Sequence, residues 1–293
     1  MILVTGAAGL TGSEVVRRLS AQGVPVRALV RKRAGAEKLA SLEGVEIVVG
    51  DMGRPETLVE PLRGVDRAML ISSSDPAMLD VQSSFIEAAK EAGVAHVVKL
   101  SGIMPELDSP FRFARMHGEI ERRLEVSGVP FTHLRAGEFM PAYFRQVPSI
   151  VAQGSFSVPM ADAATASFDV GDLAEIAVTA LTSSGHEGKT YRLTGPEALS
   201  MAQVAERLSA ATGNTIRYLD VSPEAYESAN LARGMPPYLA AALVELYAER
   251  RNGKEGTVYA DAEMLLGRPA TTFEAFAVRN AAVFRGEQPA ARV

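Results

Sequence analysis

The chain has 293 residues, of which 47% are hydrophobic and 22% are charged, values typical of a folded globular protein. The formal net charge is -5 and no long basic block is present, so the sequence lacks the electrostatic footprint of a nucleic-acid-binding protein. Cysteine is absent, which excludes disulfides, thiol nucleophiles and cysteine-ligated metals. No apolar run approaches the ~20 residues needed to cross a bilayer. The first residues are typical of a core strand rather than a signal peptide, so we expect a cytoplasmic protein without a membrane partner.

The first nineteen residues predict a buried strand, a tight turn and a helix. An apolar run over residues 2–4 is followed by Gly6, Gly9 and Gly12 at Gly-x-x-Gly-x-x-Gly spacing, and then by apolar residues at helical spacing. This pattern suits a dinucleotide pyrophosphate, which needs bare backbone close by and a helix N-terminus pointing at it. An ordinary glycine-rich turn is the alternative. The residues expected around the phosphates are Gly6, Ala8, Gly9, Leu10 and Thr11.

A cluster of cations follows the second predicted strand, residues 24–30. In dinucleotide-binding folds the adenosine ribose lies at this strand tip, and an acidic residue there accepts the ribose hydroxyls of NAD. Here Arg31, Lys32 and Arg33 occupy the tip. A guanidinium can grip a 2′-phosphate through two hydrogen bonds, so the sequence predicts NADP(H) in preference to NAD(H), with Arg31 as the contact. A solvated basic turn is the other interpretation.

Strands and helices alternate with short connections through the first half of the chain. We expect further strands at residues 45–49, 67–71, 95–100 and 131–134, and helices at 34–42, 58–62 and 79–92. This alternation predicts an α/β fold with a doubly wound parallel Rossmann sheet.

Polar residues follow two of these strands. Asp51, next to Met52, is placed either to bind the adenine amino group or to cap a turn. Ser72, Ser73 and Ser74 follow the fourth strand, where small hydroxyl residues suit a cofactor ribose, although they also suit any loop.

The second half is less regular and predicts a smaller α/β substrate-capping region. We place the NADP-binding Rossmann domain at residues 1–150 and the capping region at 151–293, with the segment 166–195 returning to the main sheet. Ser200 is expected to cap a helix. A mobile charged loop is expected at 250–256 and a single final helix at 271–284.

The motifs along the first 135 residues, Ser101 among them, resemble those of a known family. They are Thr5-Gly6-x-x-Gly9-x-x-Gly12, Asp51, the turn at 72–74, Ser101, His117-x-x-x-Glu121 and the segment 127–135. Together they resemble the NmrA-like branch of the atypical short-chain dehydrogenases/reductases, most closely its type 2 quinone oxidoreductases and then its triphenylmethane reductases. The resemblance covers nearly the whole chain. It is specific for the branch but not for a reaction.

One departure from the wider family bears on the reaction. Typical members carry Tyr-x-x-x-Lys on the helix after the fifth strand, and those positions fall on Phe113 and His117. A phenyl ring cannot donate a proton, which disfavours alcohol dehydrogenation and sugar epimerisation. Hydride addition to a quinone instead gives a phenolate-type anion, whose conjugate acid titrates near ~10, so water or a weak donor can protonate it.

The resemblance therefore implies an NADPH-dependent reductase of a quinone or similar conjugated aromatic acceptor. The alternative is an NADP(H)-binding redox sensor without turnover, because sensors of this branch also lack the tyrosine. A sugar epimerase is the weakest of the three. We expect a small aromatic or quinone-like substrate and a monomer or homodimer.

His117 and Ser101 are the residues expected nearest the chemistry. His117 is placed to bind the nicotinamide ribose, to protonate the product or to pack as a structural histidine. Glu121 either orients His117 or pairs with a neighbouring arginine. No two histidines have metal-ligand spacing, so no metal is expected. The side chains expected to form an apolar acceptor wall, unless they are ordinary core residues, are Phe113, Phe139, Met140 and Phe144.

Overall fold

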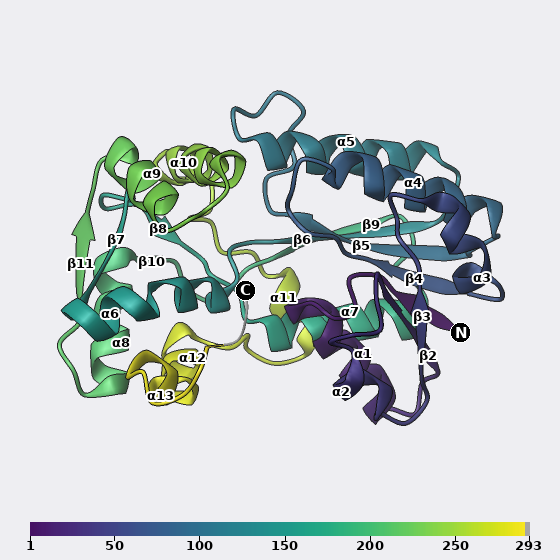
Figure 1. Cartoon of the computed structure of the whole chain (residues 1–293), viewed down its shortest axis with the longest axis horizontal. Coiled ribbons are helices and arrows are strands. Elements are labelled where there is room, and N and C mark those ends of the chain that lie inside the picture. The colour runs from purple at the N-terminus through teal and green to yellow at the C-terminus, as the bar shows by residue number, and fades with distance from the viewer. Residues whose placement is uncertain (291–293) are drawn as a thin grey trace. The chain divides into compact units, whose positions relative to one another are not determined.

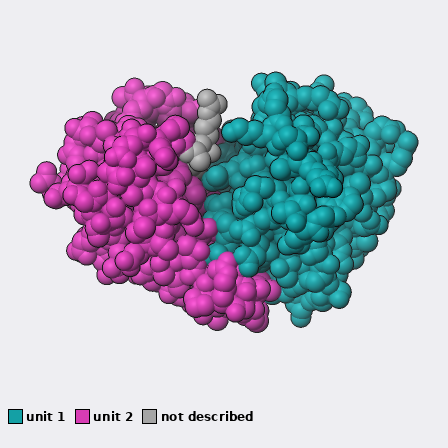
Figure 2. Space-filling model, turned by 90° about the horizontal axis from the view of Figure 1, so that it is seen from below, with its two compact units in different colours: residues 1–108, 113–135, 170–192 teal, residues 109–112, 136–169, 193–293 magenta. Residues whose placement is uncertain are grey.

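The computed structural model describes residues 1–290, which form two compact units (Figure 2). Unit 1 comprises residues 1–108, 113–135 and 170–192, and unit 2 comprises the remaining described residues. The domain boundary expected at residue 150 differs from this division, because the chain after residue 135 packs into the core of unit 2. Residues 291–293 of the expected capping region lie outside the described residues.

A seven-stranded sheet in the order β3-β2-β1-β4-β5-β6-β9 is the centre of the fold (Figure 1). Its strands are β1 (Ile2–Val4), β2 (Val26–Val30), β3 (Val45–Val49), β4 (Arg67–Leu70), β5 (His96–Gly102), β6 (Phe131–Ala136) and β9 (Lys189–Leu193). β1 pairs in parallel with β2 on one side and with β4 on the other. β2 with β3 and β4 with β5 are parallel as well, so the predicted doubly wound α/β fold is confirmed.

Helices cover both faces of this sheet. They are α1 (Leu10–Ala21), α2 (Glu37–Ala40), η1 (Pro55–Leu58), α3 (Val59–Leu62), α4 (Met78–Glu91), α5 (Arg112–Val126) and α7 (Val170–Thr182). Figure 1 shows α4 and α5 on one face and α1 with α7 on the other. The apolar stripe Val15, Val16 and Leu19 turns α1 toward the sheet, because these residues recur at helical spacing and are fully buried.

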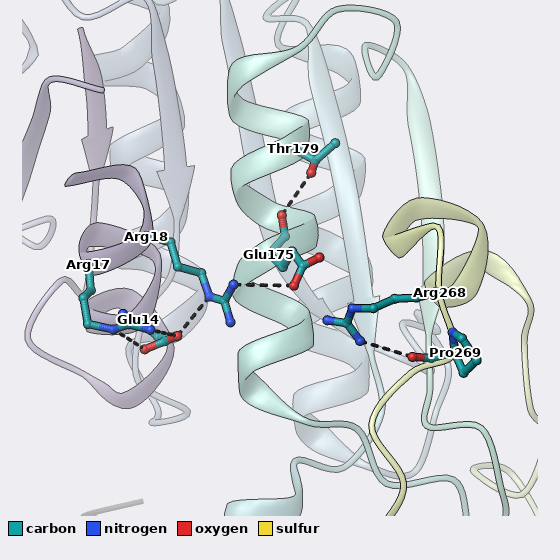
Figure 3. A network of polar contacts seen from close by, with 7 residues as sticks. All are labelled: Glu14, Arg17, Arg18, Glu175, Thr179, Arg268 and Pro269. Atoms are coloured by element: carbon teal, nitrogen blue, oxygen red, sulfur yellow. Dashed lines mark hydrogen bonds and ion pairs between the residues drawn. The ribbon is translucent and has the colours of Figure 1, made fainter. Parts of the chain in front are cut away.

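An ion pair joins the two helices on the α1 face. Arg18 Nη1 lies 3.5 Å from Glu175 Oε2 of α7, and Glu14 binds Arg18 Nε at 2.9 Å (Figure 3). All three side chains are partly exposed, so this network contributes little to stability beyond the apolar packing between the helices.

Unit 2 has its own aromatic core. Its elements are η2 (Met140–Gln146), α6 (Val147–Gln153), β7 (Ser155–Val158), β8 (Ala164–Thr165), β10 (Leu199–Ser200), α8 (Met201–Thr212), β11 (Arg217–Asp220), α9 (Pro223–Ala232), α10 (Pro237–Arg251), α11 (Asp261–Leu266), α12 (Phe273–Arg279) and α13 (Ala281–Phe284). β7 pairs with β11 and β8 with β10. Ser200 caps α8 in a capping box with Gln203, which confirms the predicted cap.

One expectation for unit 2 is wrong and another is confirmed only in part. The expected single helix at 271–284 is divided at Asn280, whose backbone leaves the helical region at φ -111° and ψ 16°. The expected loop at 250–256 begins two residues later, because α10 ends at Arg251, and its mobility stays a prediction. Arg250 is buried in α10, with Glu138 and Glu255 each 2.7 Å away. Buried charges need such partners, so the carboxylates hold this segment in place. Among residues 1–290 no helix is long and apolar enough to cross a membrane.

Candidate active site

The candidate site lies at the carboxyl edge of the sheet in unit 1, where the strand order reverses between β1 and β4. In open parallel sheets this switch point leaves a crevice for ligands. Thr5 joins the loop after β1 to the loop after β4. Its hydroxyl donates to the Ile71 carbonyl at 2.7 Å and accepts from the Ile71 N–H at 2.7 Å. The glycine turn after β1 and the serine turn after β4 are therefore held together.

The glycine turn has the geometry that a pyrophosphate requires. Gly6 has φ +57°, a conformation that favours glycine, and its carbonyl accepts the Gly9 N–H at 2.9 Å. A Cβ on Gly12 would lie 2.8 Å from the Gly6 carbonyl carbon and 2.9 Å from the Ala7 Cα, so only glycine lets α1 start this close to β1. No side chain caps α1 and its first turn holds no acidic residue. Its N-terminal N–H groups thus remain available to an anion, and the cradle fits a dinucleotide.

The other residues expected around the phosphates differ in exposure. Ala8 and Gly9 are exposed, Leu10 is half-buried and Thr11 is buried. Thr11 can therefore face a ligand through its main-chain N–H at the start of α1 more readily than through its side chain.

Arg31 lies directly after β2 and is exposed. Within residues 1–290, neither Arg31 nor Lys32 nor Arg33 forms an ion pair, so the basic tip has no internal carboxylate to neutralise it. This arrangement suits an anionic ligand group. Phosphate recognition by Arg31 stays a prediction.

Asp51 caps a turn, one of its two expected roles. Its Oδ1 accepts the Gly53 N–H at 2.9 Å, and its own N–H donates to the Thr57 hydroxyl at 2.8 Å. Oδ2 lies 3.7 Å from Arg54 Nε and remains partly exposed, and Met52 beside it is half-buried. A contact from Asp51 or Met52 to adenine stays a prediction.

The serine turn is fixed from behind by a buried amide. Gln82 of α4 donates from Nε2 to the Ser72 hydroxyl at 2.8 Å, and Ser72 donates to the Ser73 carbonyl at 3.2 Å. Ser73 and Ser74 are exposed. The turn therefore presents hydroxyl groups on a rigid support, as a ribose site would require, and sequence reasoning did not identify Gln82.

A buried lysine in the middle of β5 is the main feature that sequence reasoning missed. Lys99 and Ser101 lie two residues apart and share one face of the strand. The Lys99 side chain is fully buried, and its Nζ lies 3.2 Å from the Leu100 carbonyl oxygen and 3.0 Å from His117 Nδ1. The available signal was a charged residue inside the otherwise apolar run 97–100.

His117 projects from α5 over the end of β5. A Cβ on Gly102 would lie 3.2 Å from the imidazole Cδ2 and 3.8 Å from Nε2, so the glycine makes room for the ring. The side chain is partly exposed. The neighbouring Ser101 hydroxyl is buried and has no hydrogen-bond partner among the described residues. The structure thus brings the two expected catalytic residues, Ser101 and His117, to one strand end.

Burial controls the charges of Lys99 and His117. It lowers the pKa of Lys99 to about 7, an effect that the carboxylate of Glu121 opposes. Burial and the neighbouring Lys99 charge lower the pKa of His117 well below its usual value. The imidazole is therefore neutral at pH 7, and a charged Lys99 donating to Nδ1 places the imidazole proton on Nε2.

Glu121 pairs with Arg135 rather than with His117. Arg135 Nη2 lies 2.6 Å from Glu121 Oε2, and Arg135 Nε is 3.2 Å from both carboxylate oxygens. This confirms the arginine alternative. The fold also brings the ligand atoms of Glu121, Glu125 and His133 within 4.8 Å of one another, which histidine spacing did not predict. In this cluster Glu121 is already paired with the guanidinium of Arg135.

The residues expected to form an acceptor wall divide between the two units. Phe113 is buried in α5 of unit 1. Phe139 is half-buried in unit 2, while Met140 and Phe144 belong to its core, where the ring of Phe144 lies 5.5 Å from that of Phe276. Core packing accounts for the burial of Met140 and Phe144. A contact from any of the four to a substrate stays a prediction.

The parallel sheet and the glycine turn at its switch point define a Rossmann-type α/β protein. The model of the NmrA-like family matches residues 1–277, and the chain belongs to this family. The family resemblance predicted from the sequence is thereby confirmed.

Two relatives align over almost their whole length. The chain is 39% identical to an NAD(P)H azoreductase of Xenophilus azovorans, covering 97% of this chain and 99% of the relative. It is 37% identical to a (4-alkanoyl-5-oxo-2,5-dihydrofuran-3-yl)methyl phosphate reductase of Streptomyces griseus, covering 98% and 100%.

Two solved structures have the same fold. An NADPH-dependent quinone oxidoreductase of Escherichia coli in complex with NADPH superposes with a TM-score of 0.87 at 31% identity, covering 96% of this chain and 99% of the other. The triphenylmethane reductase of Citrobacter sp. in complex with NADP(H) gives a TM-score of 0.84 at 26% identity, covering 96% and 100%.

Proposed function

We propose that this protein is an NAD(P)H-dependent reductase that passes hydride to a quinone or similar conjugated acceptor. The oxidoreductase class follows from the near full-length relationship to two reductases at 39% and 37% identity. The observation that carries the acceptor class is Phe113, which stands where related dehydrogenases have an acidic tyrosine, while a neutral histidine follows four residues later. The site therefore suits an acceptor whose reduced product needs no strong acid.

The cofactor is held by backbone and by a few side chains. The turn from Gly6 to Gly9 and the N-terminus of α1 hold the pyrophosphate, and the serine turn at 72–74 holds a ribose. Arg31 binds the 2′-phosphate, which favours NADP(H) over NAD(H). When bound, the dihydronicotinamide supplies the hydride.

The acceptors named in the relatives share one chemical property. Azo compounds, quinones, triphenylmethane dyes and an oxo-dihydrofuran bearing an alkanoyl group are all conjugated and electron-poor. Hydride addition to a quinone places the negative charge on a delocalised phenol-type oxygen, which titrates near ~10. An imidazole N–H is then a sufficient donor when the other ring nitrogen gains a proton in the same step, whereas a simple ketone would give a far more basic alkoxide.

We assign proton donation to His117 through Nε2 and a hydrogen-bonding role to the Ser101 hydroxyl. Both groups lie at the end of β5, and Nε2 is the imidazole nitrogen that does not face Lys99. Phe113, which lies on α5 in unit 1 as His117 does, is proposed to contribute an apolar wall for a flat acceptor. The alternative is an NADP(H)-binding sensor without turnover, because a sensor would also lack the acidic tyrosine that Phe113 replaces.

The deciding experiment follows NADPH oxidation against a panel of quinones, azo dyes and triarylmethane dyes, with the protein-free rate subtracted. We expect saturable turnover that falls by about 10²-fold in kcat in His117→Ala, because general acid catalysis contributes on this scale. His186→Ala, which alters a histidine in the turn before β9, is the matched control and should retain activity. Tight NADPH binding without turnover on any acceptor would identify a sensor instead.

A further inference from the structure

The contact between Lys99 and His117 joins the interior of the sheet to the candidate active site. Lys99 lies in β5 and His117 in α5, both within unit 1. A buried ammonium is costly unless its hydrogens find acceptors, and the Leu100 carbonyl and His117 Nδ1 are the acceptors that the fold provides. The lone pair of Nδ1 must therefore face Lys99 whenever the ammonium is charged.

We propose that Lys99 holds the His117 imidazole neutral with its proton on Nε2, and supplies a proton to Nδ1 in the same step in which Nε2 releases one to the reduced product. Lys99 is thus a positioning and proton-supplying residue that acts only through His117. This inference rests on the proposed function for its second half, the proton resupply. The first half, the charge and tautomer of His117, is a property of the protein alone.

The proton movements balance. The Nε2–H bond of His117 breaks as a proton joins the anionic product, and one Nζ–H bond of Lys99 breaks as a proton joins Nδ1. The imidazole stays neutral throughout, and the lysine is left as an amine. Water then protonates Nε2 at the partly exposed ring as Nδ1 returns its proton to the buried Lys99 amine, which restores both starting states.

The charged residues around Lys99 and His117 favour proton transfer between these two side chains over an ion pair between Lys99 and a carboxylate. Glu121 of α5 attracts the Lys99 charge but is bound by Arg135 of β6, so it does not hydrogen-bond Lys99. His133 of β6 has its pKa lowered to about 4 by burial and adds no charge at neutral pH. With its pKa lowered to about 7 by burial, Lys99 can both hold and release a proton near neutrality.

The first half is tested by nitrogen-15 NMR of the imidazole nitrogens during a pH titration of the full chain. The chain has four histidines, and the signals missing from His117→Ala assign His117. We expect wild-type His117 to stay neutral with the proton on Nε2 to pH values well below 6.5, its usual pKa. In Lys99→Met its pKa should rise by at least one unit, with both tautomers populated. A wild-type His117 that titrates near 6.5, or that carries its proton on Nδ1, would overturn the proposal even if Lys99→Met did not fold.

The second half is tested by the pH profile of kcat. In the wild type kcat should fall as the pH rises through about 7, because Lys99 loses the proton that it supplies. Lys99→Met should lose this dependence and turn over at least ten-fold more slowly at pH 6, whereas Lys90→Met, a change of an exposed lysine in α4, should match the wild type. Parallel profiles for Lys99→Met and wild type would overturn the resupply step. Absence of wild-type turnover would refute the proposed function and the resupply together, while the NMR titration would still decide the first half.

Discussion

Lys99 shows how one buried charge decides the chemistry available to its neighbour. Its ammonium has neutral hydrogen-bond partners, a carbonyl oxygen and an imidazole nitrogen, so burial lowers its pKa instead of being offset by a bonded carboxylate. The same burial keeps His117 uncharged. A charged imidazolium would not form in this environment at pH 7, so His117 can protonate a delocalised anion only if Lys99 supplies a proton to Nδ1 in the same step.

Arg31 is the residue on which cofactor preference depends. Removing its guanidinium in Arg31→Ala should weaken NADPH binding by about 10- to 100-fold, since a charge-assisted hydrogen bond contributes about 1.5–3 kcal/mol. NADH binding should be unchanged because NADH lacks the 2′-phosphate. Fluorescence titration with both cofactors measures the ratio.

Lys32→Ala is the matched control for Arg31→Ala, because it removes a neighbouring exposed cation. Its affinity ratio should stay closer to that of the wild type. If the NADPH to NADH affinity ratio is the same in Arg31→Ala and wild type, the basic tip is a solvated turn and the assignment of Arg31 fails.

Sequence reasoning at the residue scale succeeded where local spacing carries the information. The glycine positions and the Ser200 cap depend on neighbours within a few residues, and the structure has both. Glu121 was left between two partners because Arg135 lies on another element. Lys99 was missed because its partner His117 is eighteen residues away and only the packing of α5 on β5 brings them together.

At the element scale, the junction of β1 and α1 is the most constrained part of the candidate site. Gly12→Ala would place a Cβ against the backbone of Gly6 and Ala7, which cannot move aside as a flexible side chain can. Overpacking of this kind costs about 1–3 kcal/mol, and α1 would have to move away from the turn. If the bound state bears this cost, we expect NADPH affinity to fall by about 5- to 100-fold, by the conversion of 1.4 kcal/mol per decade, with a melting temperature lower by a few degrees.

Gly137→Ala is the control for Gly12→Ala, because a Cβ there meets its neighbours at 3.4 Å or more, an ordinary contact. Isothermal titration and thermal unfolding of both variants separate the local effect from a general one. Wild-type NADPH affinity in Gly12→Ala would show that the glycine turn does not form the pyrophosphate site.

Elements with a strong apolar period were predicted better than short or divided ones. The amphipathic pattern located α1, α4 and α8, since each buries one face against its own unit. The pattern at 271–284 continues across Asn280 although the backbone does not, because apolar spacing does not record a change of chain direction. Arg250 was assigned to a loop because its partners Glu138 and Glu255 are not visible as a local pattern.

For the whole molecule, the sheet order and the family membership are established, and the acceptor is a proposal. Apart from residues 109–112, unit 2 begins at residue 136, whereas the expected boundary lies at residue 150, because the composition of the chain does not change at residue 136. A monomeric or homodimeric state and a cytoplasmic location stay predictions. The central claim is that the protein turns over its nicotinamide cofactor rather than only binding it.

The most direct test is a single-turnover experiment in which protein-bound NADPH is mixed rapidly with a quinone. NADPH carrying deuterium at the transferred position is compared with unlabelled NADPH, and oxidation is followed by the loss of dihydronicotinamide absorbance. We predict oxidation faster than that of free NADPH and slower with deuterium, because the transferred hydrogen moves in the measured step. Bound NADPH that is oxidised no faster than free NADPH across the acceptor panel would contradict the account and leave a cofactor-binding sensor.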